Sequence, residues 1–140
     1  MVLGFIHFIV LVYSFRMDGN VEVFSLNKLL LHAEGFMVFV ISIYFYAGNG
    51  FSWLLFFLLL FIPDLWMIGY AFNRKVGAII YNIVHTYVFS ILLILIGLIF
   101  SNDMFLTIGL ISVAHIGMDR TFGYGLKYPT DFKDTHLQRI

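Results

Sequence analysis

Ionisable side chains lie inside long apolar runs of this sequence, where few such residues are expected. Asp64, His85, His115 and Asp119 each interrupt an apolar run, and Glu34 lies near the start of another. A charged residue at the centre of a membrane helix costs about 2.5–3.5 kcal/mol on insertion scales, whereas a leucine or phenylalanine contributes only about 0.3–0.6 kcal/mol. Residues that are this costly to insert are expected to form a functional site.

The residue types favour a divalent metal ion. The chain has no cysteine, so the ligands would be imidazole and carboxylate, which suit zinc, with iron or manganese as alternatives. His115 and Asp119 are four residues apart and therefore share one helical face. We predict that Asp64, His85, His115 and Asp119 bind the metal ion.

Further residues are candidates for catalysis or for support of the ligands. Glu34 is predicted to be a general base that activates water, or a further ligand, and Asp64 is the second catalytic candidate. Residues predicted to hold the ligands or the substrate are Tyr70, Tyr81, Asn82 and Arg120. Arg120 could instead reach toward the membrane surface, or it could bind an anionic headgroup or a phosphate.

Composition predicts an integral membrane protein. The 140 residues are 61% hydrophobic and only 11% charged, whereas a soluble domain averages about 25% charged residues. The net charge is zero, and no basic stretch is long enough to suggest nucleic-acid binding. The expected partners are membrane lipids, a lipid-like substrate and a second copy of the chain.

Four apolar stretches are long enough to cross a hydrocarbon core of about 30 Å. They cover residues 29–47, 51–72, 76–99 and 104–122. Short connectors make successive helices antiparallel neighbours, so the fold class is an all-α integral membrane protein with an antiparallel four-helix transmembrane bundle. Ser52 and Asp103 are the predicted N-caps of the second and fourth helices.

All eight basic residues fall on one side of this topology. They are Arg16, Lys28, Arg74, Lys75, Arg120, Lys127, Lys133 and Arg139. By the positive-inside rule this side is cytoplasmic, which predicts a protein of the cell (inner) membrane with a cytoplasmic C-terminus. The five ionisable residues then lie in the cytoplasmic half of the bilayer, around a polar pocket that opens to the cytoplasm.

We divide the chain into an N-terminal apolar segment with its linker (1–27), the four-helix transmembrane domain (28–122) and a cytoplasmic tail (123–140). Residues 2–15 are apolar but short, which favours an interfacial helix over a fifth span. The tail contains Gly123, Gly125 and Pro129, which break helices. It either covers the mouth of the pocket or is solvated.

Several motifs resemble those of a bacterial family of small membrane proteins, domain of unknown function 4260. The motifs are residues 63–70 (PDLWMIGY), 81–87 (YNIVHTY), 115–120 (HIGMDR), 123–128 (GYGLKY) and 132–137 (FKDTHL). The resemblance covers roughly residue 30 to the C-terminus and implies four spans. It implies no established activity.

A looser resemblance links the order Pro-Asp, His-Thr and His-x-x-x-Asp to membrane-bound metal-dependent hydrolases. It implies that Asp64, His85, His115 and Asp119 are metal ligands. The leading hypothesis is therefore a membrane-embedded, metal-dependent hydrolase of lipid-like substrates. The alternatives are a proton-coupled or ion transporter that uses the same residues, and a non-enzymatic subunit or oligomer-forming protein in which the polar residues form a structural network.

Overall fold

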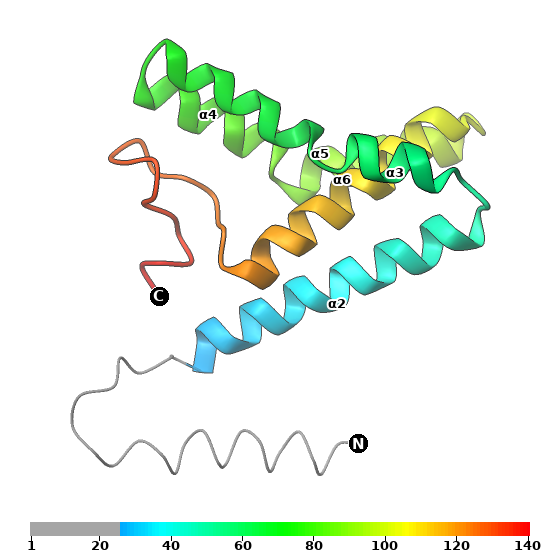
Figure 1. The fold of residues 1–140 in the computed structure, drawn as a ribbon, viewed down its shortest axis with the longest axis horizontal. Coiled ribbons are helices and arrows are strands. Elements are labelled where there is room, and N and C mark those ends of the chain that lie inside the picture. The colour runs from blue at the N-terminus through cyan, green and yellow to red at the C-terminus, as the bar shows by residue number, and fades with distance from the viewer. Residues whose placement is uncertain (1–25) are drawn as a thin grey trace.

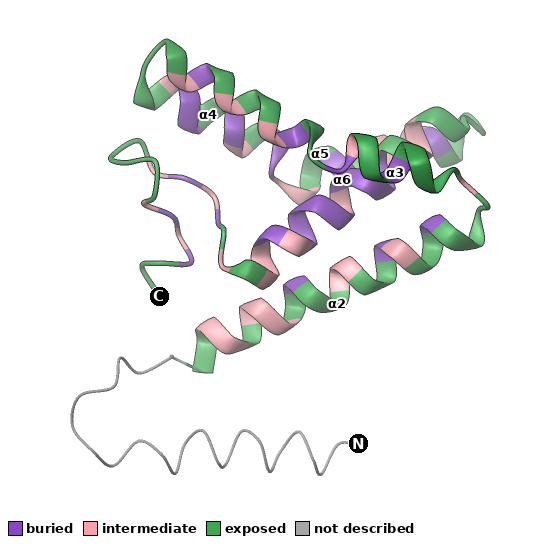
Figure 2. Ribbon diagram, in the orientation of Figure 1, coloured by how far each residue is buried: buried purple, intermediate pink, exposed green. Residues whose placement is uncertain are grey.

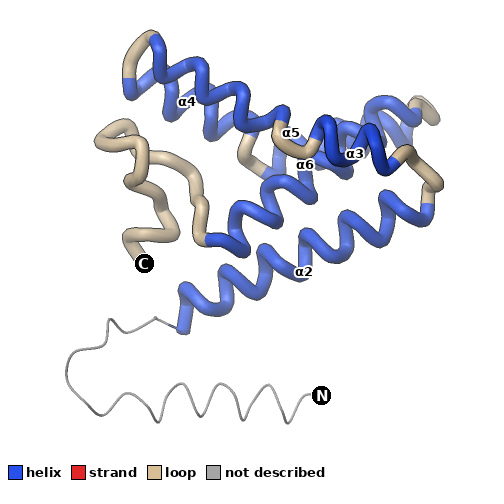
Figure 3. Tube along the Cα trace, in the orientation of Figure 1, coloured by secondary structure: helices blue, strands red, loops and turns tan. Residues whose placement is uncertain are grey.

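The described part of the chain is helical. The computed structural model describes residues 26–140, so the predicted N-terminal helix at residues 2–15 lies outside it. The helices are α2 (Leu26–Gly48), α3 (Trp53–Leu59), the 3-10 helix η2 (Ile62–Ala71), α4 (Arg74–Val84), α5 (Tyr87–Ile99) and α6 (Asp103–Phe122). Residues 26–140 contain no strand, and the tail is mostly loop (Figure 3).

Three segments are long and apolar enough to cross a membrane. They are Leu26–Gly48, Trp53–Ala71 and Arg74–Ile99, which supports the prediction of a membrane protein. The predicted fourth span forms helix α6, which has 20 residues but is not one of these three segments. Its polar residues, among them His115 and Asp119, lower its mean hydropathy. A four-helix bundle therefore stays a prediction.

Of the two predicted N-caps, Ser52 is confirmed and Asp103 is not. Ser52 caps α3, because its hydroxyl accepts a hydrogen bond from the backbone N–H of Leu55 at 3.5 Å. The prediction for Asp103 is wrong. Asn102 caps α6 instead, and its Oδ1 accepts from the backbone N–H groups of Met104 (3.0 Å) and Phe105 (3.2 Å). Asn102 has the extended backbone of a cap, whereas Asp103 is already the first helical residue.

The second and third predicted spans each break into two helices. Pro63 lies in the first turn of η2, where its missing N–H and its ring prevent α3 from continuing. Residues 76–99 were predicted as one helix, but α4 ends at Val84 and Thr86 has an extended backbone before α5 begins. Arg120 donates to the carbonyl of His85 at 3.2 Å, which satisfies an acceptor that the break leaves free.

Helix α6 is central among the described helices. It lies between α2 and α5, while η2 packs against α4 (Figure 1). Half of the α6 residues are buried, more than in α2 (Figure 2). The backbones of α2 and α6 approach closely at Gly117, where an added Cβ would lie 2.7 Å from the backbone nitrogen of Phe39. This packing holds α6 fixed beside the breaks in the other helices.

Candidate metal centre

Four predicted ligands from three helices meet at the helix breaks. Asp64 lies in the first turn of η2 and His85 is the C-cap of α4, while His115 and Asp119 lie on one face of α6. One ligand atom from each residue lies within 4.8 Å of the others. We call these four residues the His/Asp group, and they could hold a metal ion. Both histidines are fully buried, whereas the Asp64 side chain is 36% exposed.

The separations of the ligand atoms match those around a metal ion. The two Nε2 atoms of His85 and His115 are 3.1 Å apart. Asp64 Oδ1 lies 3.4 and 3.6 Å from these two nitrogens, and Asp119 Oδ2 lies 3.8 and 3.5 Å from them. Ligand atoms bound tetrahedrally to zinc, at bond lengths of about 2.0–2.1 Å, lie about 3.3 Å from one another. The His/Asp group therefore has the spacing of a coordination shell.

Tyr81 contacts two members of this group. Its backbone carbonyl lies 3.0 Å from Nδ1 of His85. A carbonyl oxygen can only accept, so Nδ1 carries the proton and the lone pair of Nε2 is directed toward the other ligand atoms. The Tyr81 ring stacks on the His85 ring at 3.6 Å, and the Tyr81 hydroxyl donates to Asp119 Oδ2 at 3.3 Å. Tyr81 thus orients both side chains.

Tyr70 and Asn82 contact the tail instead. The Asn82 side chain donates to the carbonyl of Lys127 at 2.9 Å and accepts from its backbone N–H at 2.7 Å. The Tyr70 ring packs edge-on against Phe132, with centroids 5.2 Å apart. Both side chains therefore hold residues 123–140 against η2 and α4, and neither is part of the His/Asp group.

The tail covers one side of the helices and is not a solvated extension. Leu137 and Thr135 are buried, with exposed fractions of 0% and 3%. Arg139 donates to both carboxylate oxygens of Asp134, and Thr130 also donates to this carboxylate. These contacts, led by the Arg139 hydrogen bonds, lower the pKa of Asp134 to about 2. Parts of the tail are therefore packed and not solvated, whereas coverage of the mouth of the predicted polar pocket stays a prediction.

Lys127 is a charged residue near the His/Asp group that sequence reasoning missed. Its Nζ donates to the carbonyl of Phe132 at 2.9 Å and lies 4.7 Å from the centre of the Tyr81 ring. Burial lowers the pKa of Lys127. No spacing rule in a segment rich in helix-breaking residues indicates which position becomes buried, so the sequence alone could not have identified it.

Arg120 and Glu34 are not members of the His/Asp group. Arg120 donates to the carbonyls of His85 at 3.2 Å and Tyr124 at 2.6 Å. Glu34 is exposed on α2 and lines a separate pocket together with Arg120. The structure therefore does not bring Glu34 to the predicted ligands, where a general base or a further ligand would have to lie.

Residues 28–140 match the family described as Domain of unknown function (DUF4260). The chain belongs to this family. The DUF4260 match includes every member of the His/Asp group and the whole tail. Comparisons with curated proteins and with solved structures found no match. The likeness of this DUF4260 chain to membrane-bound hydrolases therefore stays a prediction.

Proposed function

We propose that this DUF4260 chain binds a divalent metal ion, preferably zinc with iron or manganese as alternatives, and hydrolyses a lipid-like substrate in the membrane. The observation that supports metal binding is the spacing of the four ligand atoms, which lie within 4.8 Å of one another in a largely buried setting. Without a cation, few contacts would offset the free-energy cost of removing two carboxylates and two imidazoles from water.

The unequal burial of the four ligands supports a catalytic role. His85, His115 and Asp119 are buried and would form a set of two imidazoles and one carboxylate, a ligand set that catalytic zinc sites use with a fourth position left open. When bound, a divalent cation acts as a Lewis acid on a carbonyl or phosphoryl oxygen. Asp64 is more exposed, so its carboxylate would either complete the ligand set or accept a proton from the attacking water.

We further propose that the chain crosses the membrane four times as an antiparallel bundle. Helix α6 is shielded by α2 and α5, and a shielded helix can cross a bilayer with polar side chains that face its neighbours. The basic residues then place the C-terminus in the cytoplasm. The His/Asp group would lie in the cytoplasmic half of the bilayer, within reach of lipids in the inner leaflet.

Metal analysis of protein purified without chelators tests the first step. We expect about one zinc, iron or manganese ion per chain, and loss of the ion in the double variant His115→Ala, Asp119→Ala. The matched control is Asp103→Asn, an aspartate on the same helix outside the His/Asp group. Absence of a stoichiometric ion, or equal metal content in the double variant and the control, would contradict metal binding.

A second experiment separates metal binding from catalysis. Asp64→Asn keeps the three buried ligands, so we expect it to retain metal while hydrolysis of fluorogenic ester and phosphodiester lipid analogues falls at least about 100-fold. Retention of metal by the unmodified protein and by Asp64→Asn, with no metal-dependent cleavage of either analogue by the unmodified protein, would point to a non-enzymatic role.

The helix breaks favour one alternative, a proton-coupled or ion transporter. Discontinuous helices often surround the ion and substrate sites of transporters, and here the breaks lie at Leu60–Phe61 and His85–Thr86, next to the His/Asp group. This alternative predicts pH-dependent ion flux in reconstituted liposomes, with loss of the flux in His85→Ala. Flux that is unchanged by His85→Ala, or no flux at all, would rule it out.

A further inference from the structure

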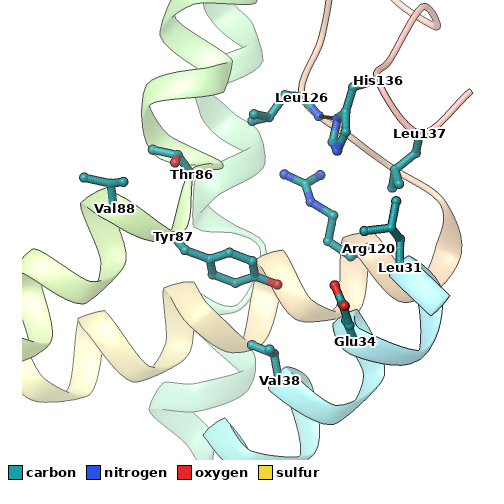
Figure 4. Close-up of a pocket in the computed structure, with 11 residues that line it drawn as sticks. Leu31, Glu34, Val38, Thr86, Tyr87, Val88, Arg120, Leu126, His136 and Leu137 are labelled. Atoms are coloured by element: carbon teal, nitrogen blue, oxygen red, sulfur yellow. Dashed lines mark hydrogen bonds between the residues drawn. The ribbon is translucent and has the colours of Figure 1, made fainter. Parts of the chain in front are cut away.

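A pocket lies next to Arg120, the residue that follows Asp119 of the His/Asp group. It has a volume of about 340 Å³ and is bounded by α2, the start of α5, the end of α6 and the tail (Figure 4). Its apolar lining includes Leu31, Val38 and Val88. Its polar lining comes from Glu34, Thr86, Tyr87, Arg120 and His136. We call it the Arg120 pocket, and its volume is within the range of small-ligand sites.

The pocket contains two side chains of opposite charge, Arg120 and Glu34. Arg120 has five N–H donors, and in the described part of the chain it gives two hydrogen bonds, both to backbone carbonyls. Within residues 26–140, neither Arg120 nor Glu34 belongs to an ion pair closer than 4 Å. A partly buried guanidinium and a carboxylate that share an apolar pocket would each gain from a ligand group of opposite charge.

Tyr87 and His136 also line the pocket and can act as neutral donors. The backbone N–H of Leu126 donates to Nδ1 of His136 at 2.8 Å, so the proton of the neutral imidazole is on Nε2. Burial and the nearby Arg120 lower the pKa of His136, which keeps its ring neutral near pH 7. The Tyr87 side chain extends toward Arg120 and Glu34 (Figure 4). The pocket thus combines one cation and one anion with the neutral donors Tyr87 and His136.

We infer that the Arg120 pocket binds a zwitterionic aminophospholipid. Arg120, Tyr87 and His136 would donate to the phosphate, Glu34 would accept from the primary ammonium group, and Leu31, Val38 and Val88 would contact the start of an acyl chain. An anionic headgroup without an amine would leave Glu34 unpaired. A quaternary ammonium group has no N–H that could donate a hydrogen bond to the Glu34 carboxylate. This site is distinct from the His/Asp group and touches it through the Arg120 hydrogen bond to His85.

Lipid competition tests this inference independently of metal. The full chain, with chelator and without, is incubated in detergent with equal amounts of phosphatidylethanolamine, phosphatidylcholine and phosphatidylglycerol that carry the same acyl chains. Retained lipid is then read by native mass spectrometry. We expect phosphatidylethanolamine to be retained about fivefold over the other two, the ratio for one partly screened ion pair. Equal retention of all three lipids would overturn the inference.

A charge reversal in the pocket gives the decisive comparison. Glu34 is exposed on α2, so Glu34→Lys should leave the fold intact while it shifts the preference to phosphatidylglycerol. The matched control Asp103→Lys reverses a charge outside the pocket and should retain the original preference. A phosphatidylethanolamine preference that survives in Glu34→Lys would contradict the inference. Loss of metal in His115→Ala, Asp119→Ala with the lipid preference unchanged would show that the two sites are separate.

Discussion

Tyr81 supports the His/Asp group at the scale of a single residue, through its contacts with His85 and Asp119. Partners of metal ligands fix their orientation and raise their affinity for the ion, and their loss costs about 10- to 100-fold in metal affinity. Substitution by phenylalanine removes the Tyr81 hydroxyl and its hydrogen bond to Asp119, but it keeps the backbone carbonyl and the ring that stacks on His85.

We predict that Tyr81→Phe weakens metal binding about 10-fold, because Asp119 loses a hydrogen bond that holds it toward the histidines. The measurement is competition with a chelator of known affinity. Tyr70→Phe is the matched control, since the Tyr70 hydroxyl has no hydrogen-bond partner within residues 26–140. Equal metal affinities of the two variants would show that the Tyr81 hydroxyl has no role in metal binding.

Residue spacing in the sequence could place only two members of the His/Asp group next to each other. His115 and Asp119 are four residues apart, which puts them on one face of any helix that contains them. Asp64 and His85 belong to other helices, so their approach to α6 depended on the packing of η2 and α4. Glu34 has the same apolar sequence context as these residues, but α2 places it at a different pocket.

At the scale of the elements, the close approach of α2 and α6 fixes one wall of the Arg120 pocket. Gly117 lies two residues before Asp119, and a Cβ at this position would meet the backbone of α2 at 2.7 Å. Backbone atoms cannot move aside as the end of a flexible side chain can. Small residues at such crossings allow helices in membranes to pack closely.

Gly117→Ala should therefore destabilise the protein by about 1–3 kcal/mol, the usual effect of overpacking. Gly48→Ala is the matched control. Gly48 lies at the end of α2, and an added Cβ there has no neighbouring atom within 4 Å. Thermal unfolding in detergent, followed by tryptophan fluorescence, measures both variants. A Gly117→Ala protein as stable as the control would argue against close packing of α2 on α6.

At the scale of the whole molecule, the number of crossings decides where the tail lies. With four crossings, the connector between α2 and α3 is outside and both the connector between η2 and α4 and the tail are inside. If α6 does not cross, the tail is outside. The absence of cysteine from the chain allows single cysteines to report each side without background labelling.

We predict that a membrane-impermeant maleimide labels Asn49→Cys in intact cells, but labels Lys75→Cys and Lys133→Cys only after the membrane is opened. The physical reason is the placement of Lys and Arg on the cytoplasmic side. All three positions are exposed in the structure. Labelling of Lys133→Cys in intact cells, with Lys75→Cys protected, would show that α6 does not cross the membrane.

The sequence by itself determined the helical class, the apolar segments and the identity of the costly polar residues, because hydropathy and helical spacing are local properties. The break between α3 and η2 has a local cause in Pro63, since proline lacks the backbone N–H that a helix interior requires. The sequence did not predict the break at His85 and Thr86. Neither residue is a strong helix breaker, and the freed carbonyl of His85 is satisfied by Arg120 of a distant helix.

Only the tertiary structure decided which polar residues meet. The packing of η2 and α4 beside α6 brought Asp64 and His85 to His115 and Asp119, and the tail was fixed over this region by Asn82 and Lys127. It also separated Glu34 from the candidate ligands and placed it with Arg120 at another pocket. These outcomes depend on contacts between residues far apart in the chain, which local spacing and hydropathy do not encode.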